Sequence, residues 1–401
     1  MSYADLLRGP HVVRLLLGTL VGRLPSAMAS VAVPLALRQA GASYGFVGVA
    51  VGAFAIASAA GGPLLGRLVD RVGQPRVLLP TALVAAVGFA VVAVAPGSTA
   101  AVLTGVVLAG AATPPLEPCL RALWPDLVAP GKLESAYALD SASQELVFVG
   151  GPLVVAGGVA VASPSAALWA GALLGVAGVL VVATAPPARV WQAPARAAGR
   201  LGPLRSRGLV VLLTGLTGAG VAIGTLNVLV VSYAEEHRMP GGAPALLALN
   251  ALGALAGGLG YGAVRHWRVA PPRRTLLMML GLTAGYGLLC LLPAPPYMAG
   301  LMLFTGLFLA PVLTVVFVLV GDLAPAGTVT EAFAWLVTLM TAGVALGSAV
   351  TGTVLEEAGP AWAASCGVAG LAAGTLVILA GQAQLVPAAR EAAEEAAAHA
   401  A

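Results

Sequence analysis

The sequence predicts an all-α integral membrane protein with twelve transmembrane helices, arranged as two six-helix bundles that are related by a pseudo-two-fold repeat. Of its 401 residues, 59% are hydrophobic and only 9% are charged, whereas a soluble domain carries roughly 25% charged residues. Twelve segments have about the 20 mainly apolar residues that cross a bilayer. The second half also repeats the helix-breaking residues of the first half at a fixed offset.

The first six predicted helices follow one another with short connections. They cover residues 11–36, 44–66, 77–96, 99–123, 136–161 and 166–185. The first segment is too long, and too interrupted by Arg23, to be a cleavable signal peptide. Connections as short as Ala95 to Ser98 make consecutive helices antiparallel neighbours.

The last six predicted helices follow a basic linker. They cover residues 209–233, 243–263, 275–293, 297–320, 331–355 and 361–384. The linker carries five arginines and no acid. We therefore divide the chain into an N-terminal bundle over 1–185, a cytoplasmic linker over 186–208, a C-terminal bundle over 209–386 and a cytoplasmic tail over 387–401.

An offset of 196 residues aligns the two halves without a gap. It pairs Gly66 with Gly262 and Pro115 with Pro311, among other glycine and proline matches. Such register indicates a duplicated six-helix unit whose two parallel repeats enclose a central path.

Basic residues predict the orientation, because loops rich in Arg and Lys stay in the cytoplasm. With the N-terminus inside, 17 of the 20 basic residues fall at cytoplasmic ends and loops. We expect a multi-pass protein of the plasma membrane with both termini in the cytoplasm. The three cysteines are far apart, so neither a disulfide framework nor a metal site is indicated.

A loop after the second predicted helix carries the most specific motif. The segment from Gly66 to Arg76 has a glycine, an aspartate four residues on, a basic residue next, a glycine two residues later and a final arginine. It resembles the signature loop of the major facilitator superfamily, with Pro75 in place of the first member of the final basic pair. The resemblance implies the major facilitator fold and a cytoplasmic gate. The gate residues that we expect are Gly66, Asp70, Arg71, Gly73, Arg76, Arg121 and Asp140.

In this gate Gly66 permits a close helix approach. Asp70 can accept hydrogen bonds from backbone donors of the opposite half and can bind its cations when the cytoplasmic side is shut. The alternative is that the arginines of this loop only fix the topology. A gate that also fixes topology has the greater weight, because a topology signal has no use for Asp70.

The fifth predicted helix resembles that of the twelve-helix drug and metabolite exporters of the superfamily. Gly151-Pro152 is followed by a glycine pair at 157–158, two residues later than the antiporter motif requires. The arginine that those exporters carry four residues before Gly110 is Val106 here. This departure weakens the case for proton-coupled drug antiport.

Away from the ends of the predicted spans, charged residues lie in the first half only. Each costs several kcal/mol to insert, so each is a functional candidate. Arg23, Glu117 and Glu145 are candidates for coupling and translocation, and depth counting pairs Arg23 with Glu145. A structural role for this pair has about equal weight. Arg121 with Asp140 fits a gate or packing role better than substrate contact.

The second half offers neutral polar groups in place of these charges. At the offset of 196, Arg121 corresponds to Phe317. The candidates for a substrate cavity are Asn227, Asn250, Tyr286, Thr305 and Thr314. Such a wall suits an amphiphilic or weakly polar organic solute, although Asn227 and Asn250 are more often helix-packing groups than ligands.

These features predict a secondary transporter, a proton-coupled exporter of a small organic compound that works by alternating access as a monomer in the lipid bilayer. Uptake by symport and facilitated diffusion are the alternatives. No phosphate-binding glycine loop is present, and no histidine lies at a depth suited to intramembrane catalysis, so we expect no enzyme activity, cofactor, metal or nucleic-acid partner. A scaffold without transport would not explain the costly charges.

Overall fold

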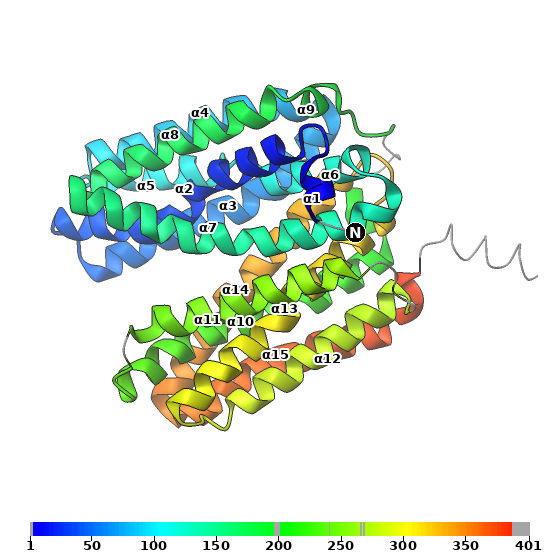
Figure 1. The fold of residues 1–401 in the computed structure, drawn as a ribbon. Helices are drawn as coiled ribbons and strands as arrows, with labels where there is room; N and C mark the ends of the chain where they lie inside the picture. The colour runs from blue at the N-terminus through cyan, green and yellow to red at the C-terminus, as the bar shows by residue number, and fades with distance from the viewer. Residues whose placement is uncertain (1–2, 196–200, 240, 265–266, 268, 387–401) are drawn as a thin grey trace, which may run out of the picture.

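A computed structural model describes residues 3–195, 201–239, 241–264, 267 and 269–386. All regular elements in these ranges are helices (Figure 1). The predicted tail over 387–401 and the predicted cytoplasmic arginines at 196, 200, 265, 268 and 390 lie outside the described residues.

The N-half holds eight helices that precede residue 186. They are α1 (Tyr3–Leu7), α2 (Val12–Gln39), α3 (Tyr44–Val72), α4 (Gln74–Val94), α5 (Thr99–Ala111), α6 (Leu116–Leu127), α7 (Leu133–Val161) and α8 (Pro164–Ala183). A 3₁₀ turn, η1 (Pro130–Lys132), precedes α7. The predicted fourth span is two helices, α5 and α6, because the chain leaves helical geometry between Ala112 and Pro115.

The linker contains α9 (Pro186–Val190) and the 3₁₀ turn η2 (Gly202–Arg205). The C-half then holds α10 (Arg207–Glu236), α11 (Gly242–Ala263), α12 (Pro271–Leu289), α13 (Pro295–Leu323), α14 (Val329–Ala358) and α15 (Pro360–Ala380), followed by η3 (Gln382–Leu385). The first four residues of α12 are Pro-Pro-Arg-Arg. Eleven spans in the described ranges are long and apolar enough to cross a membrane, and α12, the predicted ninth, falls short because of these residues.

Serine side chains begin four of the long helices. Ser43, Ser98, Ser163 and Ser206 each accept a hydrogen bond from a backbone N–H in the first turn of the helix that follows. This bond satisfies one of the amide groups that a helix start leaves without a partner. The caps explain why connections of only a few residues suffice between consecutive spans.

Glycines bring helices of each half into backbone contact. A Cβ on Gly178 would lie 2.2 Å from the backbone nitrogen of Gly22, where α8 crosses α2. A Cβ on Gly374 would lie 2.2 Å from the backbone oxygen of Gly215, where α15 crosses α10. Residues 178 and 374 are 196 apart, so the two halves repeat this packing, and the predicted pair of related six-helix bundles is confirmed.

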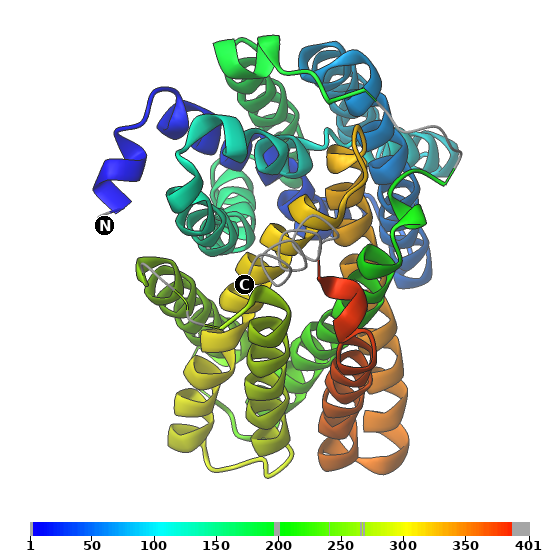
Figure 2. The same cartoon turned by 90° about the vertical axis from the view of Figure 1, so that its right-hand side faces the viewer.

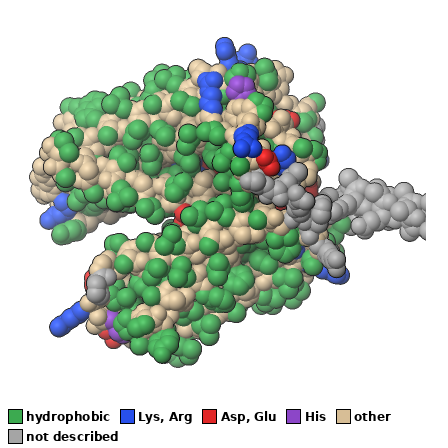
Figure 3. Space-filling view, in the orientation of Figure 1, with side chains coloured by type: hydrophobic (Ala, Val, Ile, Leu, Met, Phe, Trp, Pro, Cys, Tyr) green, Lys and Arg blue, Asp and Glu red, His purple; other side chains and the backbone are tan. Residues whose placement is uncertain are grey.

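The two halves approach each other closely at one end and diverge at the other (Figure 1). We call these the closed end and the open end. The closed end carries α1, the α3–α4 turn and the starts of α7 and α14, which is the side predicted to be cytoplasmic. Figure 2 looks onto this end, where the turn between α13 and α14 reaches up to the N-half. Figure 3 shows the groove between the halves, which widens toward the open end and has largely hydrophobic walls.

Candidate translocation site and gate

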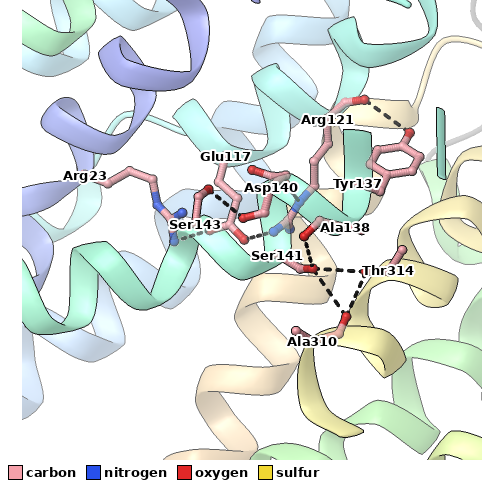
Figure 4. A network of polar contacts seen from close by, with 10 residues as sticks. All are labelled: Arg23, Glu117, Arg121, Tyr137, Ala138, Asp140, Ser141, Ser143, Ala310 and Thr314. Carbon is pink, nitrogen blue, oxygen red and sulfur yellow. Dashed lines mark hydrogen bonds and ion pairs between the residues drawn. The ribbon is translucent and has the colours of Figure 1, made fainter. Parts of the chain in front are cut away.

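Four charged side chains of the N-half form one cluster. Arg23 of α2 lies 2.6 Å from a Glu117 carboxylate oxygen, and the other oxygen of Glu117 pairs with Arg121 one turn further along α6. The Arg121 Nε donates to Asp140 of α7 at 2.9 Å. Figure 4 shows this chain of contacts. We refer to Arg23, Glu117, Arg121 and Asp140 as the charge cluster.

Gln144 extends the cluster on α7. With its amide oriented so that both polar atoms have partners, its oxygen accepts from Arg121 at 2.8 Å and its nitrogen donates to Glu117 at 3.3 Å. Arg121 is only 1% exposed, and Arg23, at 17%, is the most accessible member. A buried cluster of this kind is stable only because each charge has a partner.

The predicted pair of Arg23 with Glu145 is wrong, because Arg23 binds Glu117 instead. Depth counting compared only the first and fifth spans and left Glu117 of the fourth span out. The four residues between α5 and α6 end that helix, so α6 begins a new helix that carries Glu117 to Arg23. The prolines at 114 and 115 explain the break, since proline lacks the amide hydrogen and restricts the residue before it.

Glu145 makes no ion pair or hydrogen bond with any described residue and is partly exposed. On α7 it lies four residues beyond Ser141, whose hydroxyl lies 3.0 Å from the Thr314 hydroxyl of the C-half. Residues four apart share a helix face. Glu145 is therefore on the side of α7 that faces the C-half, one turn closer to the open end.

Two phenylalanines of the C-half cover Arg121. Its guanidinium carbon is 3.6 Å from the ring centre of Phe317 on α13 and 5.8 Å from that of Phe333 on α14. Tyr137 packs against both rings, and its hydroxyl donates to the Arg121 carbonyl at 3.3 Å. The predicted pair of Arg121 with Asp140 thus lies beneath an aromatic contact between the halves.

Asp70 reaches across the closed end to the start of α14. Its two carboxylate oxygens accept from the backbone N–H groups of Thr330 and Glu331, at 3.0 and 2.9 Å. Arg67, one turn earlier on α3, donates to the Glu331 carboxylate at 2.6 Å. Gly66 permits this approach, since a Cβ there would meet three atoms of α14 at 3.0 Å. The contact that the sequence predicted for Asp70 is present.

A second contact at the closed end joins α7 to α11. The Glu134 carboxylate accepts from the Tyr261 hydroxyl at 2.8 Å and pairs with Arg274, in the first turn of α12. Ser135 donates to the Gly262 carbonyl at 2.7 Å. Gly262 is the repeat partner of Gly66, so the closed end has two repeat-related contacts between the halves.

The N-terminal helix adds a third contact at this end. The Tyr3 hydroxyl donates to the Leu259 carbonyl of α11 at 2.7 Å. Burial raises the pKa of the Tyr3 phenol to about 12, so this donor keeps its proton at neutral pH.

Within the described residues, Arg71, Gly73 and Arg76 form no hydrogen bond or ion pair with the C-half. Gly73 has φ 90° and joins α3 to α4, a backbone conformation that favours glycine. Arg76 donates to the Val72 carbonyl, and Arg71 is exposed. Arg71 and Arg76 therefore fit a role in fixing the membrane topology of the chain.

The predicted cavity residues of the C-half have different surroundings. The Asn250 amide donates to the Thr305 hydroxyl at 2.9 Å and to the Met302 carbonyl, so these groups join α11 to α13. Tyr286 is buried and packs beside Gly367 of α15. Thr314 contacts Ser141 across the interface, and Asn227 is exposed on α10.

Sequence reasoning missed Glu331, Glu134 and Tyr261, which complete the contacts at the closed end. Both acids lie in the first turn of a helix that begins at the closed end, where a carboxylate is favoured. Their position at a helix start was the sequence signal that could have identified them. Among the described residues, no group of three His, Cys, Asp or Glu side chains is placed to hold a metal ion.

Comparisons with known proteins agree with this architecture. The sequence profile of the Major Facilitator Superfamily matches residues 15–296. The human organic anion transporter MFSD10 is 17% identical with a TM-score of 0.72, and the match covers 92% of this chain and 98% of that one. No curated protein matches the chain significantly.

Two further solved structures have similar folds, each covering 92% of this chain and 98% of the other. A bacterial homologue of the iron transporter ferroportin, in its outward-facing state, is 16% identical with a TM-score of 0.76. FucP, in its outward conformation, is 15% identical with a TM-score of 0.70. At these identities the likeness shows the fold alone.

Two six-helix bundles around a groove, with contacts between the halves at one end, define a multi-pass membrane transporter. With more than half of its length matched by the family profile, the chain belongs to the Major Facilitator Superfamily.

Proposed function

We propose that this protein is a secondary active transporter that exports a small organic compound, with protons moving in the opposite direction through Glu145. The observation that carries the proposal is an acid without an ionic partner among the described residues, on the side of α7 that faces the C-half and one turn beyond the contact of Ser141 with Thr314. A carboxylate in that position can exchange a proton with the groove.

The surroundings of Glu145 favour an organic solute with apolar parts. The side chains of the C-half that cover Arg121 are the aromatic Phe317 and Phe333, and the groove walls are largely hydrophobic (Figure 3). Apolar walls with a few polar groups bind by shape and burial of apolar area.

The contacts at the closed end serve as the gate in this proposal. Asp70 with the start of α14, and Glu134 with Tyr261, hold the cytoplasmic side shut while the groove is open to the outside. Separation of these contacts opens the cytoplasmic side, and the transporter alternates between the two states. We also propose a monomer in the plasma membrane with both termini in the cytoplasm, since basic residues gather at the closed end.

The names of the similar structures span an organic anion transporter and a homologue of an iron transporter. Such different solutes on one fold leave the solute of this chain to be found by experiment. Export rests on the glycine and proline pattern from Gly151 to Gly158, whereas Val106 in place of an arginine favours uptake by symport or facilitated diffusion as the alternative.

An accumulation assay tests the proposal. Cells that lack their own exporters receive a panel of lipophilic cations, organic anions and neutral metabolites, each with and without an uncoupler. We compare the wild type with Glu145→Gln and with the matched control Glu357→Gln, an exposed acid at the end of α14.

Lower accumulation with the wild type and the control, lost with Glu145→Gln and with uncoupler, would support proton-driven export through Glu145. Higher accumulation would establish uptake instead. Transport by Glu145→Gln at the wild-type rate would remove Glu145 from the mechanism.

A further inference from the structure

Arg121 makes two kinds of contact, and each kind is with a different half of the molecule. Its charged edge is bound by Glu117, Asp140 and Gln144 of the N-half, and its flat face is covered by Phe317 and Phe333 of the C-half. The first set moves with Arg121 in any rigid-body motion of the halves. The second set is lost whenever the halves separate at the closed end.

The aromatic contact lies on the axis that relates the two repeats. Phe317 is the residue 196 positions after Arg121, and Phe333 is 196 positions after Tyr137, whose ring centre is 6.2 Å from that of Phe333. Residues that are equivalent in two repeats touch each other only at the centre of the interface. The two phenylalanines therefore cover the cluster at the point where both halves meet.

The charges of the cluster sum to zero, with two arginines against two carboxylates. Where the phenylalanines exclude water at Arg121, a balanced cluster is tolerated, but an unpaired charge in the same place is strongly unfavourable. Separation of the halves gives water access to the cluster and removes that penalty. The equilibrium between closed and open ends therefore depends on the charge balance.

We propose that Phe317 and Phe333 form a lid that closes only over an electrically balanced cluster, so that the charge of the cluster sets the state of the cytoplasmic gate. The inference rests on alternating access in the proposed function. A charged solute that binds Arg23, the most accessible member, would disturb the balance and open the cytoplasmic side.

Spin-label distances across the closed end test the proposal without any solute. The labels are placed at Gly131→Cys in η1 and Ala326→Cys before α14, both exposed, in a background with the three native cysteines replaced by alanine. We compare the wild type, Glu117→Gln, Arg23→Gln and the double variant that carries both changes.

Each single change leaves one unpaired charge, and we expect it to shift the ratio of open to closed populations at least tenfold toward open. The double variant restores neutrality through the remaining Arg121–Asp140 pair, and we expect its ratio to return to near the wild-type value. Asp140→Asn, alone and with Arg23→Gln, provides a second pair if Glu117→Gln does not fold.

A third variant tests the lid itself. Phe317→Ser gives water access to Arg121, so Glu117→Gln should shift the ratio less in that background than in the wild type. Unchanged distances in the single variants, or a double variant more open than either single one, would overturn the proposal. Either result would leave the proposed export through Glu145 standing if the accumulation assay supports it.

Discussion

Asp70 caps a helix that belongs to the other half of the molecule. A carboxylate at a helix start satisfies free backbone amides and interacts favourably with the helix dipole. Here both amides, those of Thr330 and Glu331, begin α14. A cap usually stabilises its own helix, whereas this one stabilises one arrangement of two bundles.

Replacing Asp70 should therefore favour the open cytoplasmic gate. Asp70→Asn keeps one acceptor oxygen and loses the charge, which costs about 1 kcal/mol and raises the open population about fivefold. The alkylation rate of Thr338→Cys measures the open population. The Thr338 hydroxyl donates to the Ala59 carbonyl in the closed interface, so a cysteine at 338 reacts when the halves separate. Asp126→Asn, an exposed acid at the end of α6, is the control. Equal rates in the two variants would show that the cap does not hold the gate.

Arg121 depends on the shape of its guanidinium as well as on its charge. A lysine keeps the charge but has neither the planar face over Phe317 nor the fork that binds two carboxylates. Arg121→Lys should lower the free energy of unfolding by about 1–3 kcal/mol. Denaturant unfolding in detergent measures this, with Arg8→Lys, whose side chain is 79% exposed, as the control. A loss in the control as large as that in Arg121→Lys would refute the role of shape.

At the scale of elements, the crossing of α3 with α14 depends on Gly66. The three atoms of α14 at 3.0 Å leave no room for a branched side chain. Gly66→Val should push α14 away and lengthen the distance between labels at 131 and 326. Gly52→Val on the same helix, where no atom lies within 4 Å of the added Cβ, should leave the distance unchanged. A label distance in Gly66→Val equal to that of the wild type would mean that the two helices adjust without separating.

The limits of sequence reasoning are clearest at the fourth span. Hydropathy located the span, and its prolines were visible, but the rotation of α6 relative to α5 depends on packing of the break against neighbouring helices. The partner of Arg23 followed from that rotation and could not be obtained from depth alone. The contact of Asp70 was predictable because its motif places the aspartate at the end of a helix, where the carboxylate can reach backbone donors of the opposite half.

The repeat carried more information than the sequence prediction drew from it. The offset of 196 makes Arg121 and Phe317 equivalent positions, and the second copy has no charge there. The structure brings these two residues into contact. Equivalent residues near the repeat axis are neighbours by symmetry, so an equivalent pair with complementary chemistry predicts a contact between the halves.

At the scale of the whole molecule, two of the contacts at the closed end are made by carboxylates of the N-half. One joins Asp70 to α14, and the other joins Glu134 to Tyr261 and Arg274. They share no residues, so their contributions to the free energy should add. The double variant Asp70→Asn with Glu134→Gln should multiply the two single fold-changes in open population, measured by the label distance between 131 and 326. A double variant no more open than the stronger single one would show that the contacts form one cooperative unit.

The bond from Tyr3 to the Leu259 carbonyl has a consequence for biosynthesis. The two residues are 256 positions apart, and ribosomes add about 5–20 residues per second. Once made, Tyr3 therefore waits about 13 to 51 s before its acceptor exists. Helix α1 can dock only after α11 has been made, so its docking reports that the N-half has met the second helix of the C-half in the nascent chain.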